Sequence, residues 1–186
     1  MLLLVGLGNP GSTYTNTRHN IGFKIIDAIN SKFKLSKQKP KFKGLLTTGN
    51  INEKKVYAIK PLTFMNNSGI CIRELIEYFK IEAENIIVFH DDLDIDFGKI
   101  KTKFGGSSAG HNGIESIDKF IGKDYSRVRI GIGKPNDKIA VSDYVLKDFD
   151  DDEKQQLETL KNNITENLAI LIDKKLDLFS STVNNK

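Results

Sequence analysis

The sequence predicts one α/β domain, in which a central mixed, mostly parallel, twisted sheet is flanked by helices. Short apolar segments typical of strands alternate along the chain with segments of helical periodicity. The 186 residues are enough to bury a substantial core. No internal repeat or long linker divides them, so residues 1–186 are expected to form a single domain.

The first half of the chain predicts three strands and two helices. Residues 2–7 are apolar, but the run is too short and lacks the basic start of a signal peptide, so a buried strand is expected. Isoleucines at helical spacing follow it. The expected elements are a strand over 2–7, a helix over 20–33, a basic connection over 34–43, strands over 42–51 and 55–59 around a turn at 52–53, and a helix over 69–80.

The second half predicts three more strands and two helices. The apolar run Ile86–Phe89 is typical of a strand buried on both faces, and it delivers His90, Asp91 and Asp92 at its carboxyl end. Four acids at 150–153 suit the positive N-terminal end of a long final helix. The other expected elements are strands over 100–104 and 127–133, a helix over 112–121, and a polar end over 180–186 that frays.

Composition narrows the function classes. The formal charge of +4 is compatible with a polyanionic partner but does not establish one. The single cysteine, Cys71, cannot form an internal disulfide, which suits a reducing cytosolic compartment, and a buried structural thiol is expected there. The chain contains no apolar run long enough to span a bilayer, so no membrane partner is expected.

All three histidines lie inside dense polar blocks, which indicates an acid–base site built from several loops. A carboxylate such as Asp91 can hold one imidazole nitrogen of His19 and leave the other as a base for water. Carboxamides such as those of Asn9, Asn66 and Asn112 can supply neutral donors to a developing oxyanion. The remaining histidines, His90 and His111, are expected to place Asp91 and Asn112.

Two other kinds of site match the sequence less well. Gly6 to Gly11 fits the G-x-G-x-x-G pattern of dinucleotide-binding proteins, but helical periodicity starts only near Asn20 and no acid follows in the required context. The glycines are instead expected to form a turn that presents Asn9. The histidines and acids lack metal-ligand spacing, so no metal and no cofactor are expected.

Five ordered blocks resemble the signatures of the bacterial peptidyl-tRNA hydrolase family, and together they cover the chain to about Tyr144. The blocks are Val5–Gly11 with Tyr14 and Thr17–Gly22, Lys60–Gly69, His90–Asp94, Gly110–Gly113, and Arg127–Gly133. The resemblance implies an esterase that cleaves the bond between a peptide and the 3′-terminal ribose of tRNA. It also implies a metal-independent monomer that acts in the cytoplasm.

The resemblance also implies roles for individual residues. His19 would be the general base, Asp91 would orient it, and Asn9 would bind near the scissile ester. The residues implied to bind the peptide are Tyr14, Phe64, Met65, Asn66 and Asn112. The residues implied to contact tRNA phosphates are Lys101, Lys103 and Arg129.

The sequence departs from the family pattern in two places. Gly105–Ala109 holds two serines where some relatives carry more glycine, which could stiffen the loop over the cleft. The Lys- and Asn-rich end follows no strict pattern, so the resemblance implies no tRNA contact there. Two alternatives remain open: an RNA-binding module that kept the fold without the chemistry, and a metal-dependent amidase.

Overall fold

The computed structural model describes residues 1–136 and 138–185. Its strands are β1 (Leu2–Gly6), β2 (Lys39–Lys41), β3 (Gly44–Ile51), β4 (Lys54–Pro61), β5 (Ile86–Asp92), β6 (Ile100–Phe104) and β7 (Ser126–Gly131). Within the described residues they form one seven-stranded sheet in the order β2-β3-β4-β1-β5-β7-β6. The four central strands are parallel, and the outer pairings are antiparallel. The predicted α/β fold with a mixed sheet is confirmed.

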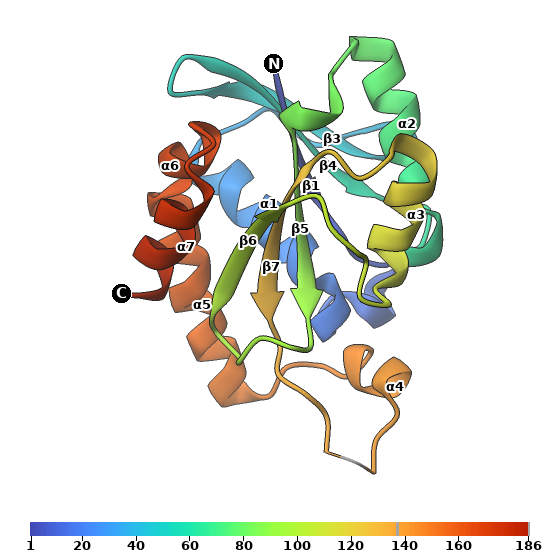
Figure 1. The fold of residues 1–186 in the computed structure, drawn as a ribbon, viewed down its shortest axis with the longest axis vertical. Helices are drawn as coiled ribbons and strands as arrows, with labels where there is room; N and C mark the ends of the chain where they lie inside the picture. Colours follow the sequence, from blue (N-terminus) through green and yellow to red (C-terminus); the bar gives the residue numbers. More distant parts are fainter. Residues whose placement is uncertain (137, 186) are drawn as a thin grey trace.

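Helices cover both faces of this sheet. They are α1 (Ile21–Lys32), α2 (Ser68–Phe79), α3 (Asn112–Ile121), α4 (Val141–Val145), α5 (Asp151–Glu166), α6 (Leu168–Ile172) and α7 (Leu176–Asn184). Figure 1 shows α5, α6 and α7 on one side of the sheet and α2 and α3 on the other. In the same view, α4 lies beyond the ends at which β5 and β7 terminate, so it is placed to form part of a site there.

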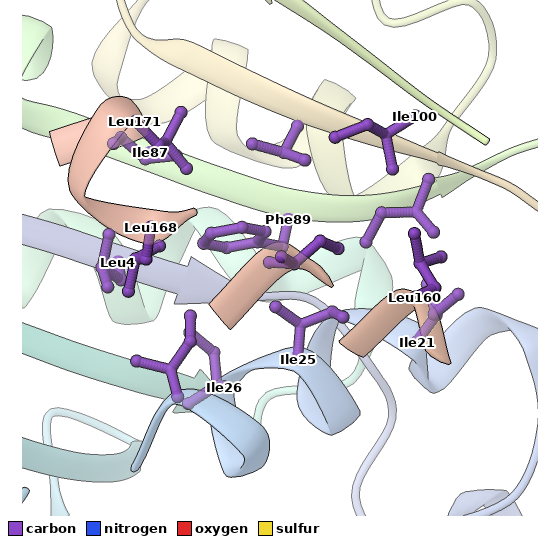
Figure 2. Packing of buried hydrophobic residues seen from close by; sticks show 14 of the residues in the cluster. Leu4, Ile21, Ile25, Ile26, Ile87, Phe89, Ile100, Leu160, Leu168 and Leu171 are labelled. Atoms are coloured by element: carbon purple, nitrogen blue, oxygen red, sulfur yellow. The ribbon is translucent and has the colours of Figure 1, made fainter. Parts of the chain in front are cut away.

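One core lies between the sheet and the layer of α1, α5, α6 and α7. Successive side chains of a strand point to opposite faces, so β1 contributes Leu4 and β5 contributes Phe89 to this core. Figure 2 shows Phe89 close to Ile25 of α1, with Leu160 and Leu168 to either side. All five side chains are buried. Burying each one stabilises the fold by roughly 1.5–3 kcal/mol, which anchors α1 and the C-terminal helices to the sheet.

A second core lies on the opposite face, between the sheet and the pair α2 and α3. The alternate strand residues Val5 and Val88 pack there with Ile72 of α2 and Ile114 of α3. Cys71 is fully buried in the same cluster, and burial raises the pKa of its thiol to about 12 despite the nearby Lys43. The thiol is therefore protonated at neutral pH, in agreement with the structural role predicted for it.

The start of α1 lies directly against the backbone of β1 and β5. A Cβ atom on Gly22 would lie 2.4 Å from both the Leu7 nitrogen and the Phe89 oxygen. These two backbone atoms are themselves joined by a hydrogen bond of 3.0 Å. Glycine at this position therefore lets α1, and the turn that precedes it, approach the two central strands.

The C-terminal region differs from the prediction of one long helix and a frayed end. The helical stretch is divided into α5, α6 and α7, with breaks at Asn167 and near Lys174, whose φ is +60°. The last helix continues to Asn184 instead of fraying after residue 180. The Asn184 side chain explains the difference, because it accepts from the Ile100 nitrogen at 2.9 Å and donates to the Ile100 oxygen at 2.8 Å.

Other boundaries also differ from the sequence prediction. The short edge strand β2 lies in the region predicted to be a connection, and α4 was not predicted. Strand β5 extends to Asp92, so His90 and Asp91 are strand residues and do not belong to the loop that follows. Among the described residues, no helix has the length and apolar character required to cross a membrane.

Candidate active site

His19 and Asp91 meet at the carboxyl ends of two neighbouring parallel strands, β1 and β5. Asp91 lies near the end of β5, and His19 lies in the 3₁₀ turn η2 (Arg18–Asn20) of the connection that follows β1. Strands β1 and β5 pair in parallel, so the chain leaves β1 beside the end of β5. The carboxyl edge of such a sheet is the usual place for a site. The fold thereby joins two residues 72 positions apart in sequence.

Two histidines hydrogen-bond the Asp91 carboxylate. His19 Nδ1 lies 2.9 Å from each carboxylate oxygen, and His111 Nε2 lies 2.9 Å from Oδ1. His111 Nδ1 accepts from the backbone nitrogens of Gly113 and Ile114 at 3.1 and 3.3 Å, so its proton is on Nε2. His19 correspondingly donates its Nδ1–H to Asp91. This tautomer leaves His19 Nε2 unprotonated and able to accept a proton.

The charge on Asp91 is stabilised despite its burial. Burial in itself raises the pKa of the carboxyl group, but the interactions with His19 and His111 outweigh it and hold the pKa well below its usual range. Asp91 is therefore ionised across the physiological pH range. This fixed negative charge beside Nδ1 holds the His19 ring in the tautomer that donates from Nδ1.

His111 and His90 both form hydrogen bonds with Asp91. His111 is the N-cap of α3. His90 is buried, its Nδ1–H donates to the Asp91 carbonyl at 2.8 Å, and its ring packs edge-on at 4.8 Å from that of His111. Burial, reinforced by the proximity of His111, lowers the pKa of His90 well below its usual value. His90 therefore remains neutral and acts as a buried hydrogen-bond donor to the strand.

Asn9 is fixed next to the turn that carries His19. Its backbone nitrogen donates to the Asn20 side-chain oxygen at 2.8 Å, and its backbone oxygen accepts from Asn20 Nδ2 at 2.9 Å. Its own Oδ1 accepts from the Met65 nitrogen at 2.8 Å. This contact sets the orientation of the carboxamide and leaves its NH₂ group as a donor. Asn20 was not among the residues predicted for the site, although its position beside His19 was a usable signal.

The residues predicted to bind the peptide divide into exposed and buried groups. Phe64 is 52% exposed, its φ is +57°, and its ring packs edge-on against Tyr14 at 6.4 Å. Asn66 and Asn112 are also exposed. Met65, predicted to line the groove, is instead 4% exposed and packed in the core beside Gly113.

A pocket of about 560 Å³ opens beside the histidine–aspartate pair. Its walls come from three parts of the chain: the end of β5 with the following turn, the loop 108–112, and five residues from 134, 135 and the start and end of α4. Lys134, Pro135, Val141, Ser142 and Val145 form the last of these walls. No sequence motif predicted that these residues would line a site. His19 thus lies at the edge of a cavity large enough for part of a substrate.

The three predicted phosphate-binding residues share one face of the sheet edge. Lys101 lies opposite Arg129 in the β6–β7 pairing, and Lys103 lies two positions along β6. Arg129 Nε donates at 2.8 Å to Asp92, which also lines the pocket. Burial, together with the charges of Arg127 and Arg129, lowers the pKa of Lys103. A row of cationic side chains therefore adjoins the pocket.

The polar atoms of His19, Asp91 and His111 lie close enough together to bind a metal ion, but they are arranged for hydrogen bonding. The ligand atoms of His19, Asp91 and His111 lie within 4.8 Å of one another. However, His111 Nδ1 already accepts two backbone donors, which places a proton on the nitrogen that faces Asp91. A metal at that nitrogen would require the loss of this proton and of the helix cap. The donor set therefore fits a hydrogen-bonded site better than a metal centre.

The fold and the site define an α/β protein with a histidine–carboxylate pair at the carboxyl edge of its sheet. The model of the family described as peptidyl-tRNA hydrolase matches residues 3–186. The chain is 78% identical over 186 residues to a peptidyl-tRNA hydrolase from Pelagibacter ubique, with 100% of both chains covered. It is 48% identical to the one from Ehrlichia canis, covering 98% of this chain and 94% of the relative.

Solved structures give the same result. A crystal structure of peptidyl-tRNA hydrolase from Acinetobacter baumannii matches with a TM-score of 0.92 and 36% identity, covering 99% of this chain and 94% of that one. The chain belongs to the peptidyl-tRNA hydrolase family.

Proposed function

We propose that this chain hydrolyses peptidyl-tRNA at the ester between the peptide and the 3′-terminal ribose, with His19 as the base that activates water. The hydrolytic activity follows from membership of the family. One observation supports the role of His19 above all: its Nδ1 lies 2.9 Å from a buried carboxylate, at the edge of the pocket. Hydrolysis of peptidyl-tRNA recycles tRNA after premature release from ribosomes.

In this mechanism, His19 Nε2 takes a proton from water as the oxygen attacks the ester carbonyl. The Asp91 carboxylate stabilises the imidazolium that forms and keeps the ring oriented. The Asn9 NH₂ group, left free by the contact of its Oδ1 with Met65, donates to the ester region. Collapse of the tetrahedral intermediate breaks the bond to the ribose oxygen, which leaves with the proton that His19 carries. No step forms a bond to the protein.

Substrate binding divides between two regions. The exposed side chains of Phe64, Asn66 and Asn112 and the partly exposed ring of Tyr14 contact the peptide, and Met65 supports them from the core. Lys101, Lys103 and Arg129 contact tRNA phosphates, which position the substrate without taking part in the chemistry. The protein acts as a monomer in the cytoplasm, where its single buried cysteine suits the reducing conditions. Sedimentation at micromolar concentration and cell fractionation test these last two statements.

The decisive assay compares N-acetyl-aminoacyl-tRNA with unblocked aminoacyl-tRNA. We expect the wild type to hydrolyse the blocked substrate and His19→Ala to lose kcat by roughly 10²–10⁴-fold while still binding tRNA. Near-normal turnover by His19→Ala would exclude the histidine base. Binding without hydrolysis by the wild type would favour an RNA-binding module. Loss of activity after exhaustive chelation, with recovery on adding metal, would favour a metal-dependent enzyme.

A further inference from the structure

Arg18, the residue directly before His19, is buried, and both terminal nitrogens of its guanidinium group are hydrogen-bonded. Its side chain is 9% exposed, and its NH2 lies 2.7 and 2.6 Å from the two carboxylate oxygens of Glu153. NH1 donates to the backbone oxygens of Asp148 and Lys147 at 2.5 and 3.3 Å. The guanidinium carbon lies 4.7 Å from the centre of the Tyr144 ring. Such a planar fork fixes geometry in a way that a lysine cannot.

The backbone on either side of Arg18 also contacts the segment that contains Asp148. The Arg18 nitrogen donates to the Lys147 oxygen at 3.0 Å, and Thr17 forms an antiparallel bridge with Asp148. The Phe149 nitrogen donates to the Asn16 oxygen at 3.3 Å. Residues 16–18 are therefore hydrogen-bonded to residues 147–149. The side-chain contacts of Arg18 join positions 129 and 130 residues apart in the sequence.

This region connects the pocket wall to α5. Glu153 also closes the capping box of α5, because its Oε2 accepts from the Asp150 nitrogen at 2.9 Å. In the other direction, 147–149 continues from α4, whose Val141 and Val145 line the pocket. Arg18 thus contacts the start of one helix and the connection to another, while its own backbone lies in the turn that carries His19.

We propose that Arg18 is a positioning residue for hydrolysis: its contacts with Glu153 and the 147–149 carbonyls hold the η2 turn so that His19 Nδ1 stays against Asp91. The proposal rests on the role of His19 proposed above. Arg18 touches no reacting atom and acts through His19. A displacement of the base by about 1 Å is enough to lower turnover by roughly 10²-fold. The contacts of Arg18 with Glu153 and the 147–149 carbonyls therefore affect kcat more than substrate binding.

Two variants and a matched control test this role. Arg18→Met removes the fork while keeping an apolar stem beside Tyr144. Glu153→Gln removes the charge partner, but glutamine still serves in the capping box, so α5 keeps its start. Arg73→Met removes the exposed Arg73–Glu77 pair on α2, far from the turn in sequence, and serves as the control. We expect about a tenfold or greater loss of kcat in Arg18→Met, a smaller loss in Glu153→Gln, little change in KM, and no change in the control.

Long-range ¹H–¹⁵N spectra of the three histidine rings give a readout independent of activity. The structure assigns the proton to Nδ1 in His19 and to Nε2 in His111. We expect Arg18→Met to weaken the Nδ1–H signature of His19 and to leave those of His90 and His111 unchanged. In a His19→Ala background, adding Arg18→Met should lower the residual rate by less than about twofold, because the two changes act on one group.

The proposal is overturned if folded Arg18→Met keeps wild-type kcat, or loses kcat while the His19 ring signals stay unchanged. If Arg18→Met does not fold, Glu153→Gln decides: wild-type kcat and ring signals in that variant overturn the proposal. The proposal is also overturned if Arg18→Met lowers the residual rate of His19→Ala by the same factor by which it lowers the kcat of the wild type. Normal turnover by His19→Ala alone would refute the base, whereas the ring signals would still report whether Arg18 positions His19.

Discussion

Asp91 receives hydrogen bonds from two imidazoles that use different nitrogens, Nδ1 of His19 and Nε2 of His111. We expect Asp91→Asn to lower kcat by roughly 10²–10⁴-fold with little change in folding. A carboxamide carries no charge to stabilise the imidazolium. Its NH₂ group would also face one of the two N–H donors, so His19 would have to turn or change tautomer.

Steady-state hydrolysis of N-acetyl-aminoacyl-tRNA measures this loss. Asp173→Asn is the matched control, because Asp173 is half exposed and pairs with Lys54 at the surface. Equal activity in the Asp91 and Asp173 variants would contradict the assignment of Asp91 to the site.

His90 links stability to pH. Its pKa in the folded chain is lowered, chiefly by burial, while an unfolded histidine titrates at about 6.5. Below that pH the unfolded chain binds a proton at His90 that the folded chain does not. The free energy of unfolding therefore falls with decreasing pH, by about 1.4 kcal/mol per unit for this residue, until the folded-state pKa is reached.

Denaturant unfolding between pH 7.5 and 5 measures the effect, with His90→Asn as the comparison. The asparagine keeps a side-chain donor but has no titration in this range. We expect the wild-type curve to fall more steeply than that of the variant. Parallel curves would show that His90 contributes no such linkage.

At the scale of the element, the contact between α1 and the central strands allows no added side chain. We expect Gly22→Ala to destabilise the fold by about 1–3 kcal/mol, because its Cβ would overlap the Leu7 and Phe89 backbone. Activity should fall as well, since α1 begins directly after the turn that carries His19. Thermal unfolding and hydrolysis assays measure both effects.

Ser31→Ala is the control for that substitution, because Ser31 lies on α1 but is exposed. Its effect on the free energy of unfolding should stay within about 0.5 kcal/mol. A Gly22→Ala protein as stable and as active as Ser31→Ala would show that α1 can move away from the sheet at little cost.

Most elements could be predicted from local pattern, whereas their ends depended on distant contacts. The apolar stripe from Leu157 to Leu171 runs across Asn167 without interruption, so periodicity alone indicated one helix. In the fold, the Asn167 side chain donates to the Asn163 carbonyl at 2.7 Å at the helix break. The ordered end of α7 depends on Ile100, 84 residues earlier, which no local pattern contains.

The candidate site could likewise be predicted only in part. His19 and Asp91 could be paired from the sequence because each follows or ends an apolar strand, and such strands share an edge when parallel. Met65 could not be placed, since its burial depends on packing against Gly113. The pocket wall formed by residues 134, 135, 141, 142 and 145 and the contacts of Arg18 could not be predicted either, because both depend on how the chain before α5 packs against segments distant in sequence.

At the scale of the whole molecule, cationic side chains lie at both edges of the sheet, but one edge adjoins the pocket. We expect Lys101→Ala or Lys103→Ala to weaken tRNA binding and to reduce the slope of log K against log salt by about 1. The matched control is Lys39→Ala, on the exposed strand β2 at the opposite edge. Binding titrations at several salt concentrations measure the slope, and equal slopes for all three variants would remove β6 from the phosphate contacts.

The pairing of Asn184 with Ile100 bears on how the chain is made. The outer edge of β6 gains this partner only after the last helix has been synthesised, 84 residues later. At 5–20 residues per second, a ribosome leaves that edge without its cover for roughly 4–17 s. An uncovered strand edge can pair with other chains. Newly made copies of this protein therefore pass through an interval of self-association risk that ends when α7 has packed against β6.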